Sequence, residues 1–323
     1  FSNTLDKNER KQDIESSNDK TLKRQTNLLH LGIGYEMAEE EEDLLSYFIE
    51  VETYRNVLRR GTTIITGRKG SGKSAIFIKL KDDLNVIDGN SISVVLRPES
   101  DDLLADVELA RLYESVSSRQ ALLTSVWRYV ILSRLLADLA GRIEVLPAFS
   151  PLSDSIEAKV VNYVKEHDTE IRDGHFSFIA RLFRSLDEIH GFGNQNALES
   201  LYEKYIGPIQ HLLQEYFADH KYTEISILAD NLDKTWDAQY GLDLQADMIL
   251  SLLSFNDRLT EELRNETIKP HTVIFLRNDI FEYVLDRARE PDKLVAKKTE
   301  VDWHRFPEKL KEMIEARFRY SLH

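Results

Sequence analysis

The feature that most constrains the fold is the segment GRKGSGKS at residues 67–74. It fits the pattern G-x-x-x-x-G-K-[S/T] in full, follows a β-branched apolar run at 62–66, and leads into a helical pattern at 74–84. Glycines in such a loop allow backbone conformations that a Cβ would block, so successive N–H groups can turn toward a phosphate at a helix N-terminus. The segment predicts a strand, a phosphate-binding loop and a helix in that order.

Two side chains of this segment have expected roles beside the backbone. Lys73 would reach the β- and γ-phosphates as a point charge, and the Ser74 hydroxyl would ligate Mg²⁺. The alternative is a glycine turn that happens to contain a lysine. We expect a site for ATP and Mg²⁺, and the residues expected to contact the nucleotide are Gly67, Arg68, Lys69, Gly70, Ser71, Gly72, Lys73, Ser74 and Ala75.

Further strand patterns follow along the chain and alternate with helical patterns. Because helices between strands act as crossovers, we expect a parallel sheet covered on both faces, in a three-layer α/β/α domain. The expected strands after 62–66 are 91–96, 225–229, 272–276 and a weaker one at 298–302. Apolar residues at helical spacing also predict helices at 44–58, 242–264 and 307–320.

The distribution of polar and apolar residues along the chain indicates four parts. Residues 1–33 are polar, with little apolar periodicity, and are expected to be an N-terminal arm or tail. Residues 34–102 would form the first part of the α/β core and residues 222–323 the second part. Between them, residues 103–221 predict a long α-helical insertion in a single α/β core.

Acidic side chains follow the strand expected at 225–229. Asp230 ends this strand and is the expected second residue of the metal site, acting through the Mg²⁺ shell. Asp233 is expected either to position the attacking water or to cap a helix that starts before Trp236. Asn231 stands where many ATPases with an additional central strand carry a catalytic glutamate, so phosphate binding is better supported than water activation.

Polar residues also follow the strand expected at 272–276. Ligands of parallel sheets gather beyond the carboxyl ends of the strands, so Arg277 or Asn278 is expected to face the γ-phosphate, unless both only cap the next helix. Arg317 on the last helix is a further candidate sensor. A basic cluster could supply an arginine finger, contact a partner or nucleic acid, or simply be solvated; it comprises Arg287, Arg289, Lys293, Lys297 and Lys298.

Composition excludes several classes of protein. The chain of 323 residues has no cysteine, which excludes disulfides, thiolate metal sites and a cysteine nucleophile. No apolar run approaches the roughly 18 residues that span a bilayer, so we expect a cytoplasmic protein without a membrane partner. The net charge of −14 argues against a protein that mainly covers DNA phosphates. The nine histidines show no ligand spacing, so no transition-metal site is expected.

Several of these segments together resemble a known family. LLSYFIEVETYRNVL ahead of GRKGSGKSAIF, the strand end ADNLDKTW, and IFLRNDI followed by AREPDKL and EVDW resemble bacterial P-loop ATPases allied to the STAND and KAP groups. The resemblance covers residues 34–98 and 222–320 and implies the strand order 5-1-4-3-2. KAP-type proteins carry Asp-Asp-Leu-Asp-Arg where this chain has Asp-Asn-Leu-Asp-Lys at 230–234.

The resemblance also implies a biological role. Relatives of this kind are often encoded in bacterial loci that defend against phage, where the ATPase is a switch or assembly motor for a homo-oligomer or a separate effector protein. We therefore expect a Mg²⁺-dependent ATPase. The alternatives are an ATP-bound assembly switch with little hydrolysis, a phosphotransferase acting on a small molecule, and an ATPase stimulated by DNA.

Overall fold

The computed structural model describes residues 38, 43–59, 64–86, 90–98, 116–145, 154–171, 195–234, 236, 241–256 and 258–321. The arm expected at 1–33 lies outside these residues, as do 103–115, 146–153 and 172–194 of the expected insertion. The chain divides into two compact units. The larger unit is Val51–Asp302, and the smaller one combines Phe1–Glu50 with Trp303–His323.

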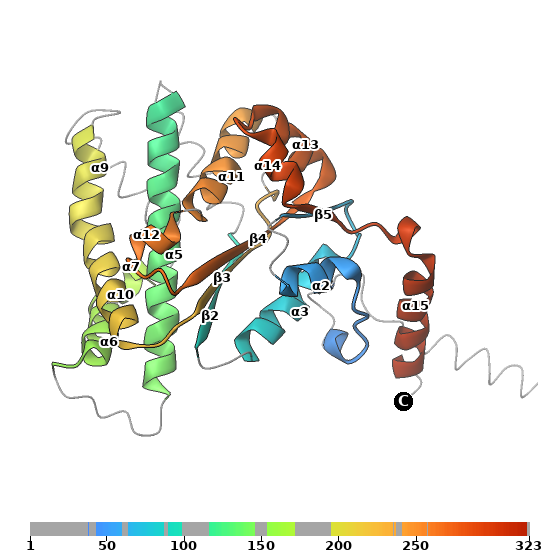
Figure 1. The fold of residues 1–323 in the computed structure, drawn as a ribbon, viewed down its shortest axis with the longest axis horizontal. Helices are drawn as coiled ribbons and strands as arrows, with labels where there is room; N and C mark the ends of the chain where they lie inside the picture. The colour runs from blue at the N-terminus through green and yellow to red at the C-terminus, as the bar shows by residue number, and fades with distance from the viewer. Residues whose placement is uncertain are drawn as a thin grey trace, which may run out of the picture. The chain divides into compact units, whose positions relative to one another are not determined.

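A five-stranded parallel sheet forms the centre of the larger unit (Figure 1). Its strands are β1 (Ile64–Gly67), β2 (Ser91–Leu96), β3 (Glu224–Ala229), β4 (Lys269–Arg277) and β5 (Lys298–Glu300). Their order is β2-β3-β4-β1-β5, which reads 5-1-4-3-2 from the opposite edge. The register pairs Gly67 with Arg277 and Leu96 with Ala229, so the carboxyl ends of the strands meet at one edge of the sheet.

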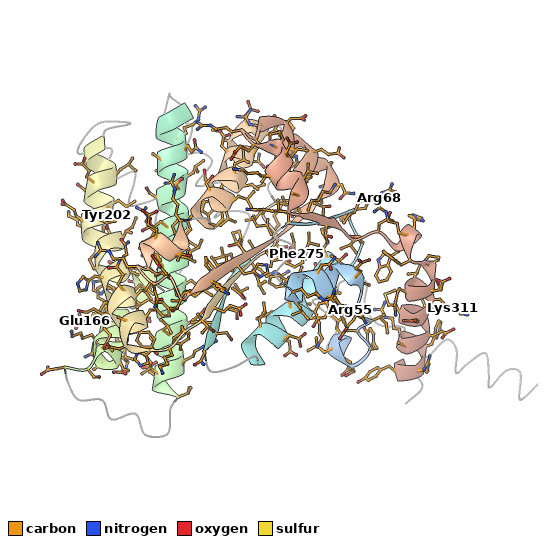
Figure 2. All side chains as sticks on the ribbon, viewed as in Figure 1. Arg55, Arg68, Glu166, Tyr202, Phe275 and Lys311 are labelled. Atoms are coloured by element: carbon orange, nitrogen blue, oxygen red, sulfur yellow. The ribbon has the colours of Figure 1, made fainter. Side chains whose placement is uncertain are left out.

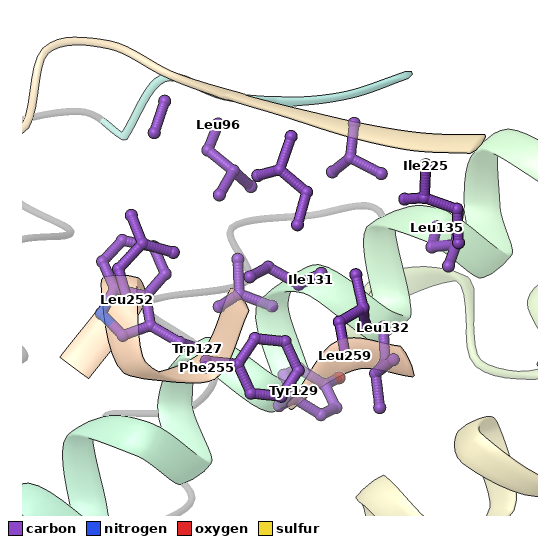
Figure 3. Close-up of a cluster of buried hydrophobic side chains, with 14 of the residues drawn as sticks. Leu96, Trp127, Tyr129, Ile131, Leu132, Leu135, Ile225, Leu252, Phe255 and Leu259 are labelled. Atoms are coloured by element: carbon purple, nitrogen blue, oxygen red, sulfur yellow. The ribbon is translucent and has the colours of Figure 1, made fainter. Parts of the chain in front are cut away.

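Helices cover both faces of this sheet. On one face, Phe77 of α3 (Lys73–Val86) packs edge-to-face on Phe275 of β4, with ring centroids 5.6 Å apart. On the other face, Ile225 of β3 belongs to a buried cluster with α5 (Val116–Glu144) and α11 (Leu242–Asn256), as Figure 3 shows. The strand side chains alternate between these two apolar layers, so the fold is α/β with helices on both sides.

Most of the described chain between β2 and β3 is helical, as expected for the insertion. The elements are α5, α6 (Ile156–Glu166), α7 (Asp168–Ile171), α9 (Gln195–Leu201), the π-helix η3 (Tyr202–Ile206) and α10 (Gly207–Asp219). Helix α5 shares the core of the sheet, so this part of the expected insertion is built into the α/β layers. Within the described part of the chain, no helix has both the length and the apolar character that membrane crossing requires.

Two helices differ from the sequence prediction. The helix expected at 44–58 is a 3₁₀ turn, η2 (Leu44–Ser46), followed by α2 (Glu52–Leu58). Val51 is extended between them, with φ −95° and ψ 162°, and β-branched Ile49 and Val51 favour such backbone. The helix expected at 242–264 is divided into α11 and α12 (Leu259–Glu262).

The remaining helices follow the last long strand. They are α13 (Asn278–Arg287), α14 (Pro291–Ala296), the 3₁₀ turn η5 (Trp303–Arg305) and α15 (Pro307–Ser321). Helix α13 contributes Phe281 to the buried cluster of the larger unit. In the smaller unit, the ring of Tyr47 lies 5.7 Å from that of Tyr320 on α15.

The side chain of Trp127 on α5 contacts α11. Its side chain is fully buried, and its Nε1–H donates to the carbonyl oxygen of Met248 at 2.9 Å. Trp127→Phe removes this donor and leaves a void, so we expect the free energy of unfolding to fall by about 2–3 kcal/mol in urea denaturation. Val145→Ala, at a residue that is 79% exposed just after α5, should change it by less than about 0.5 kcal/mol. Equal losses in the two variants would contradict this role of Trp127.

Candidate functional site

The segment 68–72 connects the buried strand β1 to α3, which begins at Lys73. Gly70 and Gly72 have φ values of 78° and 89°, a region that side chains with a Cβ rarely adopt. The N–H of Ser71 donates to the carbonyl oxygen of Arg68 at 3.1 Å, which closes a turn. Arg68 is exposed at the surface, whereas Phe275 is buried in the sheet, as the labels of Figure 2 show. The strand, glycine loop and helix thus follow in the expected order.

Gly67 ends β1 at a place with no room for a side chain. A Cβ at this position would lie 2.4 Å from Oγ of Ser71 and 3.3 Å from the carbonyl oxygen of Val301. The serine side chain can rotate, but the Val301 carbonyl belongs to the backbone that follows β5. Gly70 has nothing within 4 Å, so its positive φ is what favours glycine there.

Lys73 lies over the loop at the start of α3. Its Nζ donates to the carbonyl oxygens of Gly67 at 3.1 Å and of Arg68 at 3.0 Å. Burial lowers the pKa of Lys73 below its usual value, and the carboxylates of Asp233 and Asp230 oppose this by raising the pKa. The ammonium therefore lies within electrostatic range of acidic groups that come from the end of β3.

Asp230 follows β3 directly and is buried. Its N–H donates to the carbonyl oxygen of Leu96 at 2.9 Å, which continues the ladder between β2 and β3. Its Oδ2 lies 3.3 Å from Nη2 of Arg97, and the Arg97 guanidinium lies 4.9 Å from the ring centroid of Phe77. The sequence interpretation missed Arg97, although the rule about carboxyl ends of strands that selected Asp230 also applies to the end of β2.

Asp233 lies in a turn that follows Asn231. Asn231 has a φ of 64°, and the turn covers residues 232–234. The carbonyl oxygen of Asp233 accepts a hydrogen bond from the N–H of Trp236 at 3.1 Å. In the described part of this segment, the next helix is α11 from Leu242, so the structure gives no support to a helix-capping role for Asp233. The Asp233 carboxylate raises the pKa of Lys73, and its expected role toward the attacking water stays a prediction.

Arg277 and Asn278 both contact carboxylates. Arg277 donates from Nε and Nη2 to the two oxygens of Asp279, at 3.1 and 2.5 Å, and its side chain makes no capping hydrogen bond to α13. Asn278 donates from Nδ2 to Oε1 of Glu300 at 2.5 Å, while its Oδ1 is buried without a hydrogen-bond partner. Arg277 is thus the N-cap residue of α13, although its side chain makes no hydrogen bond to the helix backbone. Glu300 is a second residue that the sequence interpretation missed, because β5 is the weakest strand pattern.

Three of the other basic candidates have contacts of their own. Arg287 bridges α13 to α11 by donating to Asp243 at 2.7 Å and to Asp247 at 3.1 Å. Lys298 lies over the ring of Phe281, with Nζ 4.9 Å from its centroid. Arg317 belongs to the smaller unit, where its guanidinium lies over the ring of Tyr47. The contacts of Arg287 and Lys298 join elements of the fold.

The residues present fit an anion that brings a magnesium ion. Among the described residues, no group of three or more His, Asp or Glu side chains is arranged to hold a metal by itself. Ser74, the second residue of α3, and the buried Asp230 would therefore need phosphate oxygens and water to complete a Mg²⁺ shell. A cation at a helix N-terminus beside a glycine loop suits the anion.

A small cavity lies at the amino ends of the strands, away from the candidate site. It has a volume of about 50 Å³ and is lined by Val57, Leu58, Leu80, Leu84, Ser91, Glu224 and His271. Ser91 and Glu224 are the first residues of β2 and β3, so the cavity is at the amino ends of these strands. It does not belong to the candidate site at the carboxyl ends.

Comparisons of the chain with protein-family models, with curated proteins and with solved structures returned no match. The resemblance to ATPases allied to the STAND and KAP groups therefore stays a prediction. The interpretation of the site depends on the motif and on the geometry described above.

Proposed function

We propose that the chain binds ATP with Mg²⁺ at residues 67–75 and hydrolyses the bond between the β- and γ-phosphates, which gives ADP and phosphate. The observation that carries the proposal is one arrangement: the full GRKGSGKS motif joins a buried strand to a helix, and Lys73 of this motif is in range of the buried Asp230. The N–H groups at the start of α3 and the ammonium of Lys73 supply the positive potential that a triphosphate requires.

The residues divide the chemical work among them. Lys73 would exchange the carbonyls of Gly67 and Arg68 for phosphate oxygens and stabilise the charge that develops there. Ser74 and Asp230 would hold Mg²⁺, which when bound neutralises charge on the phosphates. Asp233 would orient a water and accept its proton as the water attacks the γ-phosphorus and ADP leaves. Arg277 or Asn278 would sense the γ-phosphate.

The second candidate function is an assembly switch that binds ATP and hydrolyses it little, and one observation favours it. Asn231 stands where many ATPases with an additional central strand carry a catalytic glutamate. It has a φ of 64° and supplies no carboxylate. In that case the protein would keep ATP bound, and a change of mass with nucleotide would occur without turnover. Steady ADP formation without an acceptor would count against both this switch and a phosphotransferase, and stimulation by DNA would indicate a DNA-associated ATPase.

The biological role is proposed from the resemblance alone. We propose that ATP binding and turnover act in the bacterial cytoplasm as a switch or assembly motor in defence against phage. The partners would be further copies of this chain or a separate effector protein. Mass measurements with and without ATP test the first of these, and co-purification tests the second.

Asp233→Asn tests the hydrolysis step. Asparagine keeps the size of the side chain but cannot accept a proton, so we expect ATP turnover to fall by about a hundredfold with ATP affinity within about threefold of wild type. Steady-state ADP release and equilibrium binding measure the two effects. Asp219→Asn, at the exposed last residue of α10, is the matched control and should leave both unchanged. Wild-type turnover in Asp233→Asn would remove Asp233 from the mechanism.

A further inference from the structure

We infer that Arg97 is the internal counter-ion of Asp230 in the nucleotide-free protein and that Mg²⁺ displaces it when nucleotide binds. This inference rests on the proposed function, because it concerns the carboxylate that would face the metal. It makes Arg97 a positioning residue, which acts on the site through Asp230.

The first observation is that Asp230 is buried and forms an ion pair with Arg97. The side chain of Asp230 is 8% exposed, and Nη2 of Arg97 lies 3.3 Å from its Oδ2. A buried carboxylate is costly unless a charge or hydrogen bonds compensate it. The pair is fixed by the sheet, since β2 and β3 are adjacent and parallel and each residue directly follows its strand. Arg97 therefore stabilises Asp230 before any metal arrives.

The second observation is that Arg97 has another contact to keep when it leaves the carboxylate. Its guanidinium lies 4.9 Å from the ring centroid of Phe77, which is itself fixed against Phe275 in the core. The Arg97 side chain is 28% exposed, so water reaches part of it. A cation over an aromatic ring at a partly exposed site keeps a favourable contact. Arg97 can thus shift from Asp230 without losing all of its partners.

The third observation is the crowding of positive charge. Asp230 acts electrostatically on Lys73 as well as pairing with Arg97. A magnesium ion at the same carboxylate would bring two more positive charges, and like charges in a partly buried site repel strongly. Arg97 follows β2, which β3 and β4 separate from β1, the strand that leads into the glycine loop. Arg97 is therefore the cation expected to move away from Asp230 when Mg²⁺ binds. Mg²⁺ alone, without the nucleotide phosphates, should displace Arg97 poorly.

The test compares the Mg²⁺ requirement of ATP binding in matched variants. A fluorescent ATP analogue at a fixed concentration below saturation is titrated with Mg²⁺, and the Mg²⁺ concentration at half-maximal binding is measured. Arg97→Met removes the competitor and should lower this concentration roughly tenfold, while Arg97→Lys, which keeps a cation, should lower it by about threefold. Arg128→Met removes a cation from another largely buried carboxylate, Glu262, and from the ring of Tyr202, and should leave it unchanged.

Thermal unfolding gives an independent measurement. Without metal, Arg97→Met should unfold at a lower temperature than wild type, and Mg²⁺ with the ATP analogue should restore most of the difference. If Arg97→Met does not fold, the threefold shift in Arg97→Lys decides. An unchanged or higher Mg²⁺ requirement in the Arg97 variants, with a wild type that binds ATP, overturns this inference alone. A wild type that binds no ATP overturns the proposed function, and the inference with it.

Discussion

Lys73→Ala is expected to weaken ATP binding by about a hundredfold. The ammonium lies over the loop between the carbonyls of Gly67 and Arg68, and in our account it transfers to the phosphates. A hydrogen bond to a charged group contributes about 1.5–3 kcal/mol, and the upper part of this range corresponds to such a loss. Isothermal titration of wild type and variant with Mg²⁺ and ATP measures the difference.

Lys69→Ala is the matched control for this experiment. Lys69 belongs to the same loop, but its expected contact with the nucleotide is through the backbone, which alanine keeps, and its side chain is exposed. Removing it should change ATP affinity by less than about threefold, since exposed charges are well screened. Far-UV circular dichroism and the unfolding midpoint establish that both variants fold. An affinity of Lys73→Ala equal to that of Lys69→Ala would contradict the proposed role of Lys73.

Gly67→Ala is expected to reduce both stability and ATP binding. The added Cβ would lie 3.3 Å from the Val301 carbonyl and would force Ser71 to move, because its Oγ is 2.4 Å away. Overpacking of this kind costs about 1–3 kcal/mol in the free energy of unfolding. Because Ser71 is inside the loop, its displacement should also weaken ATP binding by about tenfold or more. Urea denaturation and titration calorimetry measure the two effects.

Gly141→Ala makes the same chemical change where there is space. Gly141 lies inside α5, and a Cβ there would have nothing within 4 Å. Alanine is a better helix former than glycine by about 0.5–1 kcal/mol, so this variant should be slightly more stable than wild type. The two glycine variants should therefore shift stability in opposite directions. A Gly67→Ala protein as stable as wild type, with unchanged ATP affinity, would contradict the packing account of Gly67.

The sheet could be predicted well because its signals are local. The run SISVVL forms β2 at residues 91–96 as expected, and the strands expected at 225–229 and 272–276 are present within longer strands. Helical patterns between strands required crossovers, which made the parallel arrangement predictable. The glycine loop is also local, and its place between β1 and α3 follows from the motif.

The missed contacts of the site join residues that are far apart in sequence. Arg97 meets Asp230 only because β2 and β3 are neighbours in the sheet, and Asn278 meets Glu300 across the end of β1. No local pattern marks either pair. A list of the polar residues that follow each strand, combined with the strand order, would have brought Arg97 and Asp230 together.

The role of α5 was visible in the sequence but was underestimated. Its apolar residues occupy more than one stripe: Leu122, Tyr129 and Leu132 are buried as well as Trp127 and Ile131. A helix that is apolar around most of its circumference is buried among other elements. This is why α5 packs between the sheet and the helices of the expected insertion, in the common core.

Amide hydrogen exchange with and without a Mg²⁺-bound, non-hydrolysable ATP analogue tests the central claim most directly, because it shows where the nucleotide binds. We expect exchange to slow in peptides that cover residues 67–76, with a smaller effect around 228–234. Peptides from α10, at Gly207–Asp219, should not change. Saturable binding of the analogue with unchanged exchange at 67–76 would contradict the claim that this loop holds the phosphates.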